Sequence, residues 1–434
     1  MRTYLVGSDI LLPDHFIIGI LIFIITYVAI VSEKIHRMVI AVFGAGLMIV
    51  FHVLSQEEAL SKIDFNTLGL LIGMMIVVNV IKQTGLFQYL AIKSAKIAKG
   101  NPARIMLYFA ILTALASAFL DNVTTILLVV PVTLVITDTL KLNPIPFVLS
   151  EIMSSNIGGA ATLIGDPPNI MIGGATGLSF VDFIVNLFPL MIINFIVTII
   201  ILRFIFRKSL KVDENARQEI LSFNEKKAIT DKKLLIKSLI VLAFTIAGFV
   251  LSEVINVESA SIALFAASVL LLLSRIEPEE IMEKIEWTTI FFFGGLFILV
   301  GSLVKIGVID MIAAEVIKIT DGNMTLMTMI VLWLSTFLSS FLDNIPYVAT
   351  MIPLVDTVSS GAVHAYEPVW WALSIGACLG GNGTIIGASA NVVARGIVEK
   401  RGYTFSFMKY MKIAFPLMII SIIISSIYLL VVYL

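Results

Sequence analysis

An Asp-Asn pair lies inside an otherwise apolar stretch, Ala118-Phe-Leu-Asp-Asn-Val-Thr-Thr125, and returns 222 residues later in Ser340-Phe-Leu-Asp-Asn-Ile-Pro-Tyr347. A carboxylate within a segment long enough to cross a bilayer costs several kcal/mol unless it faces a polar cavity. A chain that carries such a group twice is expected to use it. The two pairs therefore predict two halves of one ion or substrate site.

Composition supports a membrane location for these pairs. The chain is 59% hydrophobic and 14% charged, whereas soluble domains carry about 25% charged residues. Apolar runs such as 16–31, 187–202 and 413–434 approach or reach the roughly 20 residues needed to cross a bilayer. Residues 1–13 lack the features of a signal peptide, so we expect 16–31 to be the first membrane helix.

Few partners or cofactors are indicated by the rest of the composition. The net charge is -1, without a polybasic tail that would bind nucleic acid or an acidic tail that would indicate an extrinsic partner. Cys378 is the single cysteine, which excludes an internal disulfide and a thiolate metal cluster. The residues show no nucleophile–base constellation, and we do not expect an enzyme. We expect no cofactor beyond bound sodium or a coupled proton.

An internal repeat organises the chain. Residues 63–169 align without a gap on residues 285–391, and the identical pairs are residues that shape backbone or sites. These pairs include Thr67/Thr289, Gly73/Gly295, Gly85/Gly307, Asp121/Asp343, Asn122/Asn344, Pro131/Pro353, Gly158/Gly380, Thr162/Thr384, Gly165/Gly387 and Asn169/Asn391. We expect a first repeat over 1–205, a cytoplasmic linker over 206–237 and a second repeat over 238–434.

Basic residues set the expected orientation. Lys and Arg collect in every second loop, as the positive-inside rule requires, except for Arg2, Lys62, Lys305 and Lys318. This pattern places the segments 105–140 and 203–237, together with Lys34 and Arg37, on the cytoplasmic side of a cell membrane, with both termini outside. The first Asp-Asn segment then enters from the cytoplasm and the second from outside, which is an inverted-topology repeat typical of secondary transporters.

Each repeat contains a short-limbed segment and a broken helix. The limbs 105–120 and 124–140 are short for full crossings, which favours a helical hairpin with its tip near mid-membrane. Two short, tilted spans would leave the same flanks. The stretches 158–169 and 380–391 carry glycines, and the first also carries Pro167 and Pro168, so no continuous helix passes through them. The fold class is therefore an all-α polytopic membrane protein with two inverted repeats, each with a re-entrant hairpin and a discontinuous helix.

The repeats differ in acidic and polar residues. Asp166 aligns with Ala388, Glu151 with Leu373, Asn156 with Cys378, and Ala160 with Asn382. Asp166 either binds a cation or proton, or caps the half-helix that begins near Pro167. For Glu151 we expect a structural role near the membrane face.

These motifs resemble the ion-transporter superfamily that includes arsenical-pump membrane proteins, NhaD-type sodium/proton antiporters, the melanosomal P protein and citrate-transporter-like permeases. The resemblance rests on Phe119-Leu-Asp-Asn-Val-Thr-Thr125 and on Asn156-Ile-Gly-Gly-Ala-Ala-Thr-Leu-Ile-Gly-Asp-Pro-Pro-Asn169, and is closest to the P-protein and arsenical-permease branch. It implies a homodimer in which hairpin tips and helix breaks meet at the site. A cytoplasmic ATPase is a further partner to consider.

The expected substrate or ion site combines the tips and the breaks of both repeats. Its residues are Asp121, Asn122, Thr124, Thr125, Asn156, Thr162, Gly165, Asp166, Asn169, Asp343, Asn344, Asn382, Thr384 and Asn391. Asp121, Asp343 and Asp166 are the expected proton-coupling residues. A sodium ion is expected at Asp121, Asn122, Asp343 and Asn344.

Charge decides between substrates. Two ionised aspartates facing one cavity would repel an anion by about 4 kcal/mol per close pair at an effective dielectric of 20. Dicarboxylate or other anion uptake is thus disfavoured, and burial of a carboxyl group lets it release a proton when a cation competes. We expect proton-coupled efflux of arsenite or antimonite by alternating access. The alternative is sodium/proton antiport, and an ion channel fits two inverted halves less well.

Overall fold

A computed structural model describes residues 5–6, 9–10, 13–32, 34–210, 212 and 214–434. Apart from a two-stranded antiparallel pair, β1 (Leu5–Val6) and β2 (Asp9–Ile10), the regular structure there is helical. The first-repeat helices are α1 (Pro13–Ser32), α2 (Arg37–Val50), α3 (Gln56–Ser61), α4 (Phe65–Gln83), α5 (Leu86–Ile97), α6 (Pro102–Ser117), α7 (Asn122–Thr139), α8 (Ile145–Gly159), α9 (Pro167–Thr176) and α10 (Phe180–Phe206).

A linker follows the first repeat, and the second repeat then has its helices in the same order as the first. The linker holds α11 (Glu214–Ser222) and a 3₁₀ turn (Glu225–Ala228). The second repeat holds α12 (Lys232–Ile255), α13 (Ser259–Ser274), α14 (Pro278–Met282), α15 (Trp287–Lys305), α16 (Val308–Thr320), α17 (Met324–Phe341), α18 (Asn344–Ser359), a 3₁₀ turn (Val363–Tyr366), α19 (Glu367–Gly380), α20 (Ser389–Lys400) and α21 (Phe407–Val432).

Eight helices in the described part of the chain are long and apolar enough to span a bilayer, namely α1, α4, α7, α10, α12, α15, α17 and α21. Many of their outward side chains are large and apolar, such as Phe244, which is 74% exposed. In water such a surface would be unfavourable, but in lipid it carries no penalty. The predicted multi-pass membrane class is confirmed.

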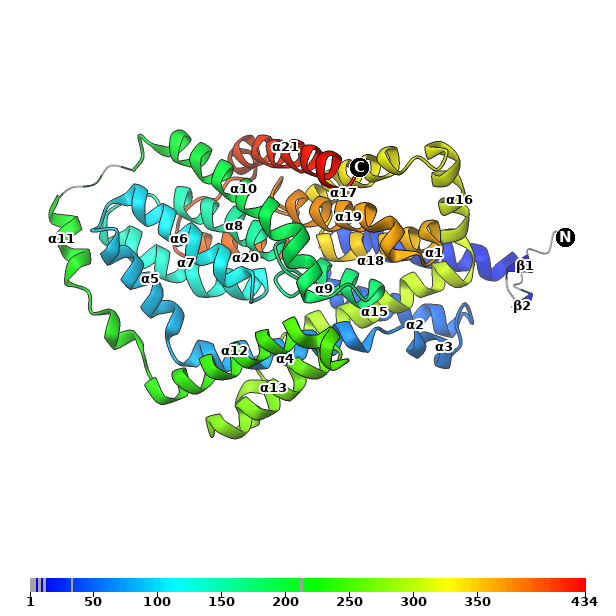
Figure 1. Cartoon of the computed structure of the whole chain (residues 1–434), viewed down its shortest axis with the longest axis horizontal. Coiled ribbons are helices and arrows are strands. Elements are labelled where there is room, and N and C mark those ends of the chain that lie inside the picture. The colour runs from blue at the N-terminus through cyan, green and yellow to red at the C-terminus, as the bar shows by residue number, and fades with distance from the viewer. Residues whose placement is uncertain (1–4, 7–8, 11–12, 33, 211, 213) are drawn as a thin grey trace.

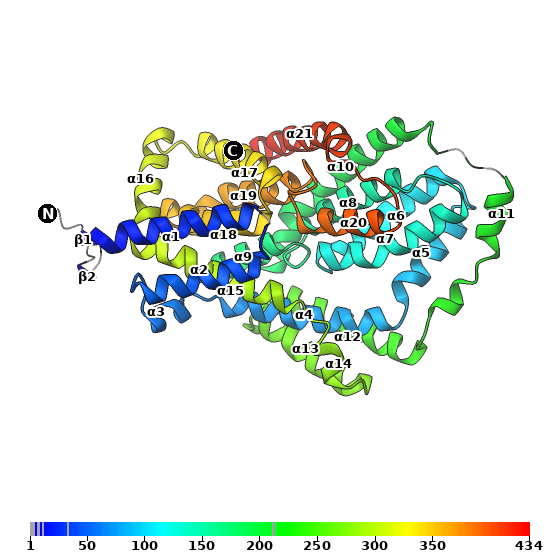
Figure 2. The same cartoon turned by 180° about the vertical axis from the view of Figure 1, so that it is seen from behind.

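Two hairpins enter the molecule from opposite ends (Figures 1 and 2). Asn101 caps the start of α6 through the Arg104 amide, and Asp121 caps α7 by accepting from the Thr124 amide at 2.8 Å. Asn323 and Asp343 do the same for α17 and α18. An N-cap residue must lie outside the helix it caps, so each Asp fixes a sharp reversal at the tip. Both tips lie inside the molecule, where Asn122 and Asn344 are buried. This arrangement agrees with the predicted hairpins.

The discontinuous helices are also present where the glycines and prolines predict them. α8 ends at Gly159 and α9 begins at Pro167, while α19 ends at Gly380 and α20 begins at Ser389. α8 packs along α6, and α19 packs along α17. Gly165 allows this approach, because a Cβ there would lie 2.5 Å from the carbonyl oxygen of Ser117. Any larger residue would push the break away from the first hairpin.

Two further helices, α5 and α16, were not anticipated from the sequence. Each follows a glycine with positive φ, Gly85 or Gly307, at equivalent positions of the two repeats. Each then packs against a hairpin limb, α5 on α6 and α7, and α16 on α17 and α18. They are amphipathic and short, so a search for apolar runs of bilayer length passes over them.

Candidate functional site

Asp166 lies at the centre of the molecule, where the two hairpin tips meet. Its side chain is fully buried (0% exposed). The Asn122 amide nitrogen lies 3.3 Å from Asp166 Oδ1, and the Asn344 amide nitrogen lies 3.2 Å from the same oxygen. One carboxylate thus accepts a hydrogen bond from each repeat. It does not cap α9 with its side chain, although it occupies the N-cap position, so the capping interpretation offered by the sequence is wrong.

Asn156 extends this cluster into the second repeat. Its amide oxygen accepts from Asn122 at 3.3 Å, and its amide nitrogen donates to Asn382 Oδ1 at 3.0 Å and to Asn391 Oδ1 at 3.1 Å. All four side chains are buried. Buried amides that satisfy one another in this way hold a fixed geometry. The asparagines therefore join the hairpin tip of one repeat to the broken helix of the other.

Four predicted residues stabilise the helix breaks. Asn169 donates to the carbonyl oxygens of Ala160 and Thr162, and Asn391 donates to those of Gly381 and Thr384. The hydroxyls of Thr162 and Thr384 donate to hairpin carbonyls, those of Ala118 and Ser340. Breaking a helix frees carbonyl groups that lipid cannot satisfy. These side chains satisfy them, which explains why the repeats share them.

A cavity of about 270 Å³ adjoins the central cluster. Polar groups on its wall are Arg37, Asp121, Asn122, Asp166, Glu286, Thr288, Thr289, Asn344 and Ser389. Three of these are carboxylic acids and one is a guanidinium, so the wall is acidic on balance. A chamber of this size admits a hydrated inorganic ion or a small solute, and cavities with a few converging polar groups are typical binding sites.

The two tip aspartates have different partners. Asp343 Oδ2 accepts from Arg37 Nη1 at 2.7 Å and from Ser389 Oγ at 2.6 Å. The same guanidinium lies over the Phe292 ring, 4.9 Å from its centroid. In the other repeat the position equivalent to Arg37 is Ser259, and within the described residues no ion pair reaches Asp121. The charge of one tip is compensated and that of the other is not.

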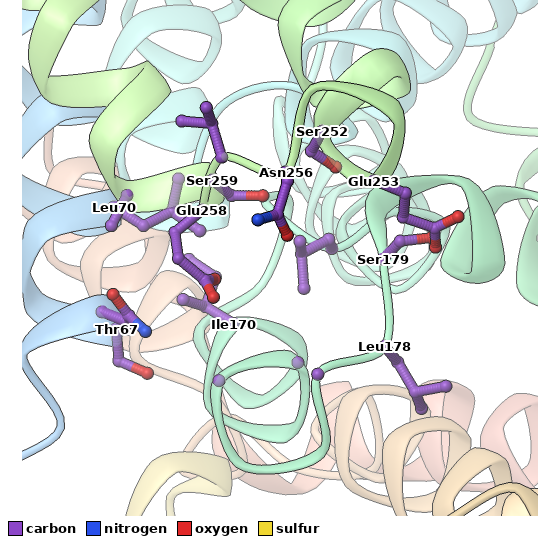
Figure 3. A pocket seen from close by; sticks show the side chains of 17 residues that line it. Thr67, Leu70, Ile170, Leu178, Ser179, Ser252, Glu253, Asn256, Glu258 and Ser259 are labelled. Atoms are coloured by element: carbon purple, nitrogen blue, oxygen red, sulfur yellow. The ribbon is translucent and has the colours of Figure 1, made fainter.

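A second polar cavity, of about 260 Å³, shares three repeat-related wall positions with the first. Figure 3 shows it between Thr67 of α4, Ile170 of α9, Glu253 at the end of α12 and the turn with Asn256 and Glu258 that follows. Asn66, Thr67 and Ser259 line it, and they align with Thr288, Thr289 and Arg37 of the central cavity. Asp166 is not among the residues that line this second cavity.

The structure thus separates the predicted residues into three groups. Asp121, Asn122, Asp166 and Asn344 line the central cavity, and Asp343 lies behind Arg37 and Ser389. Asn156, Asn382, Asn391, Asn169, Thr162, Thr384 and Gly165 form the supporting framework described above. Thr124 contributes its amide to the Asp121 cap, and Thr125 is buried with no hydrogen-bond partner for its hydroxyl among the described residues. The amides of Asn122 and Asn344 meet at Asp166. The sodium ion expected at Asp121, Asn122, Asp343 and Asn344 stays a prediction.

Arg37, Glu286 and Ser389 were missed as site residues. Arg37 was assigned by its charge to a cytoplasmic loop, yet it begins α2 and reaches the tip of the second hairpin. Glu286 immediately precedes α15, at the position equivalent to Asp64 before α4. That equivalence was a usable signal, because both acids precede a matched helix. Nothing in the sequence alone indicated Arg37.

Comparison with known proteins identifies the family to which this chain is related. The sequence profile of the citrate transporter family, CitMHS, matches residues 27–376. A 46 kDa membrane protein of Mycobacterium leprae is 40% identical over 419 residues, covering 95% of this chain and 98% of that one. An uncharacterised transporter of Mycobacterium tuberculosis is 41% identical over 419 residues, covering 95% and 97%.

More distant proteins agree with this relationship. The mouse P protein is 33% identical over 489 residues, covering 93% of this chain and 59% of that protein. The crystal structure of the Alcanivorax borkumensis YdaH transporter matches the fold with a TM-score of 0.59 at 12% identity, covering 96% of this chain and 98% of that chain. A profile match over most of the chain, together with these near full-length relatives, shows the family. The chain belongs to the citrate transporter (CitMHS) family of membrane transporters.

Proposed function

We propose that this chain is a proton-coupled secondary transporter that exchanges a hard monovalent cation, sodium, at Asp166. The observation that carries the proposal is the pair of amides, Asn122 and Asn344, that converge on this one buried carboxylate beside a cavity. Carboxylate and amide oxygens are the ligands that hard cations prefer, and the amides of Asn122 and Asn344, which donate here through nitrogen, can turn to present their oxygens to a cation. A single carboxylate that exchanges a proton for a cation gives antiport without a metal cluster.

Asp166 and Asp121 are the proposed proton-coupling groups. Asp166 is buried, and its hydrogen-bonding neighbours are the amides of Asn122 and Asn344 and the thiol of Cys378. Asp121 faces the cavity without a basic partner among the described residues. Asp343 forms an ion pair with Arg37 at 2.7 Å, so a cation already compensates its charge. We therefore assign Asp343 a positioning role, in place of the proton-carrying role first expected.

Efflux of arsenite or antimonite is the second candidate, and one observation bears on it. The single thiol, Cys378, is buried and donates to Asn169, and it is not part of the cavity wall. Soft thiophilic elements prefer thiolate ligands. A neutral arsenic hydroxide would here depend on hydrogen bonds from Asn122, Asn344 and Thr289. The hard-ligand wall favours sodium over this alternative.

The test uses purified protein in liposomes that contain a pH-sensitive dye. Sodium, lithium or arsenite is added outside, and the proton flux is recorded for the wild type, Asp166→Asn and Asp121→Asn. Asp310→Asn is the matched control, because Asp310 is exposed and remote from the cavity. We expect a sodium-driven pH change that both site variants abolish and the control retains. A pH change with arsenite alone would replace sodium by the metalloid, and no pH change with any solute would overturn proton coupling.

A further inference from the structure

Glu151 is a buried acid that the central site does not use. The sequence placed it near the membrane face, but its side chain is 0% exposed within the first repeat. Its Oε1 lies 2.5 Å from Thr133 Oγ1, and Oε2 has no hydrogen-bond partner among the described residues. Neither oxygen forms an ion pair there. An ionised carboxylate in such surroundings would carry a large desolvation cost without compensation.

The contacts of Thr133 indicate which protonation state fits. Its Oγ1 lies 2.5 Å from Glu151 Oε1 and 3.2 Å from the Val129 carbonyl oxygen. A hydroxyl has one proton to donate. Thr133 donates to Glu151 Oε1, and Glu151 Oε2 has no partner among the described residues and is free to carry a proton. With one hydrogen bond and no cation beside it, the buried carboxyl group is accommodated best in its neutral form.

Polar side chains connect Glu151 to the central cluster. On α8, Ser154 and Ser155 lie three and four residues after Glu151, so the three share one helix face. Ser155 Oγ lies 3.1 Å from Ser117 Oγ and donates to the Asn122 carbonyl oxygen at 3.2 Å. Asn122 in turn donates to Asp166. The polar face of α8 therefore runs from Glu151 to the hairpin tip.

The facing helix, α7, continues this line away from the centre. Thr125, Thr133 and Thr137 recur at multiples of four residues and so lie on one face of α7. Thr137 donates to the Thr133 carbonyl oxygen at 2.8 Å, towards the base of the hairpin. The hydroxyls of Thr125 and Ser154 have no hydrogen-bond partner in the described part of the chain. Such unpartnered groups reduce stability and call for a functional reason.

The second repeat supplies an internal control. The residues equivalent to Glu151, Ser154, Ser155 and Thr133 are Leu373, Gly376, Ala377 and Val355. The same hairpin and broken helix therefore fold without these four polar side chains, while Ser359 keeps a hydroxyl at the position of Thr137. Their presence in the first repeat is not required by the architecture, which separates them from the shared Asn and Thr residues of the helix breaks.

We propose that Glu151 is a second proton-binding site, which takes up the protons exchanged at Asp166 on the side of the molecule that holds the base of the first hairpin. The proposal rests on the proton coupling proposed above and adds a second site to it. Ser155 and Thr137 donate to backbone carbonyls, so the polar faces of α7 and α8 give Glu151 polar surroundings and not a continuous hydroxyl relay. Glu151 holds the proton between transfers, and the base of the hairpin is the side that the charge pattern predicts to be cytoplasmic.

The test places the residues of the second repeat into the first repeat, as Glu151→Leu and Thr133→Val. A third variant is Glu151→Gln. The exposed Glu315→Gln serves as the control. Sodium-driven proton flux is recorded in liposomes. Sodium binding is measured in a separate experiment, as the shift in melting temperature that sodium causes. We expect each variant at Glu151 to slow the proton flux roughly tenfold or more, while the sodium-induced shift stays that of the wild type.

Infrared difference spectra provide a measurement that does not depend on transport. We expect the wild type to show the carbonyl stretch of a protonated carboxyl group that moves on exchange into D₂O, and Glu151→Gln to lack it. Full proton flux in Glu151→Leu, or a spectrum unchanged by Glu151→Gln, would overturn the inference while leaving antiport at Asp166 in place. A wild type that moves no protons would instead overturn the proposed function.

Discussion

The two repeats share a backbone plan but differ in where they place charge. At the helix breaks the first repeat has Asp166 where the second has Ala388. At the tips Asp343 is bound to Arg37, whereas no ion pair reaches Asp121 within the described residues. The groups that satisfy the broken backbone, such as Asn169 and Asn391, are the same in both. Symmetry is kept where the fold needs it and is lost where ion chemistry is expected.

This difference teaches which acids can change their charge. Asp343 lies 2.7 Å from the Arg37 guanidinium, which compensates its charge. A buried aspartate beside amides, which can turn to donate or accept, can exist with or without its proton. We therefore expect the exchangeable charge on the first repeat, at Asp166.

The largest effect is expected when the asymmetry at the centre is removed. Asp166→Ala gives the first repeat the residue of the second and removes two hydrogen bonds to a charged acceptor, each of about 1.5–3 kcal/mol. We expect sodium-driven flux to fall by on the order of 100-fold or more. Liposome flux measures this, and Ala388→Ser, a small change at the matched position, is the control. Retained flux in Asp166→Ala would show that Asp166 is not the ion site.

An intermediate effect is expected at the tip. Arg37→Ser copies Ser259 and leaves Asp343 beside the cavity without its cation. We expect Arg37→Ser to lower the free energy of unfolding. The double variant with Asp343→Asn should recover part of that stability, because the uncompensated charge of Asp343 is then gone. A double-mutant cycle on melting free energies should give a coupling of about 1–3 kcal/mol. Additive effects of the two substitutions would show that the pair does not act as a unit.

The smallest effect is expected at the ion pair between Lys305 and Glu58, neither of which lines the central cavity. This ion pair also differs between the repeats. Lys305 lies 2.6 Å from Glu58, whereas the equivalent positions hold Gln83 and Glu280. The hydrogen bond from Lys305 lowers the pKa of Glu58 to about 2. A lowered pKa in the folded state means that the stabilisation is present above pH 4.5, the ordinary value, and is lost as the pH falls towards 2.

Substituting Lys305→Gln, the first-repeat residue, should remove this contribution. Because the Glu58 side chain is 38% exposed and therefore partly screened by solvent, we expect a loss of only about 0.2–1 kcal/mol at neutral pH. Melting temperatures recorded between pH 2 and pH 7 provide the measurement. The wild type and the variant should converge at the acid end. A constant difference across that range would show that the effect of the substitution is not electrostatic.

The sequence by itself determined the membrane class, the repeat, the hairpin tips and the breaks. Each is a local consequence of composition or of Gly, Pro and N-cap chemistry, and an exact offset between Asp121 and Asp343 needs no coordinates to be seen. It also brought forward the residues of the central cluster, because amides and carboxylates are rare in apolar segments.

Only the tertiary structure decided which of those groups meet. The contact of Asn344 with Asp166 joins residues 178 positions apart, and that of Arg37 with Asp343 joins residues 306 apart. Neither pairing follows a local period or an equivalence between repeats. Distant partners are set by how the hairpins pack across the pseudo-symmetric interface. For the same reason Glu151 read as a residue near the membrane face, although packing against α7 buries it beside Thr133.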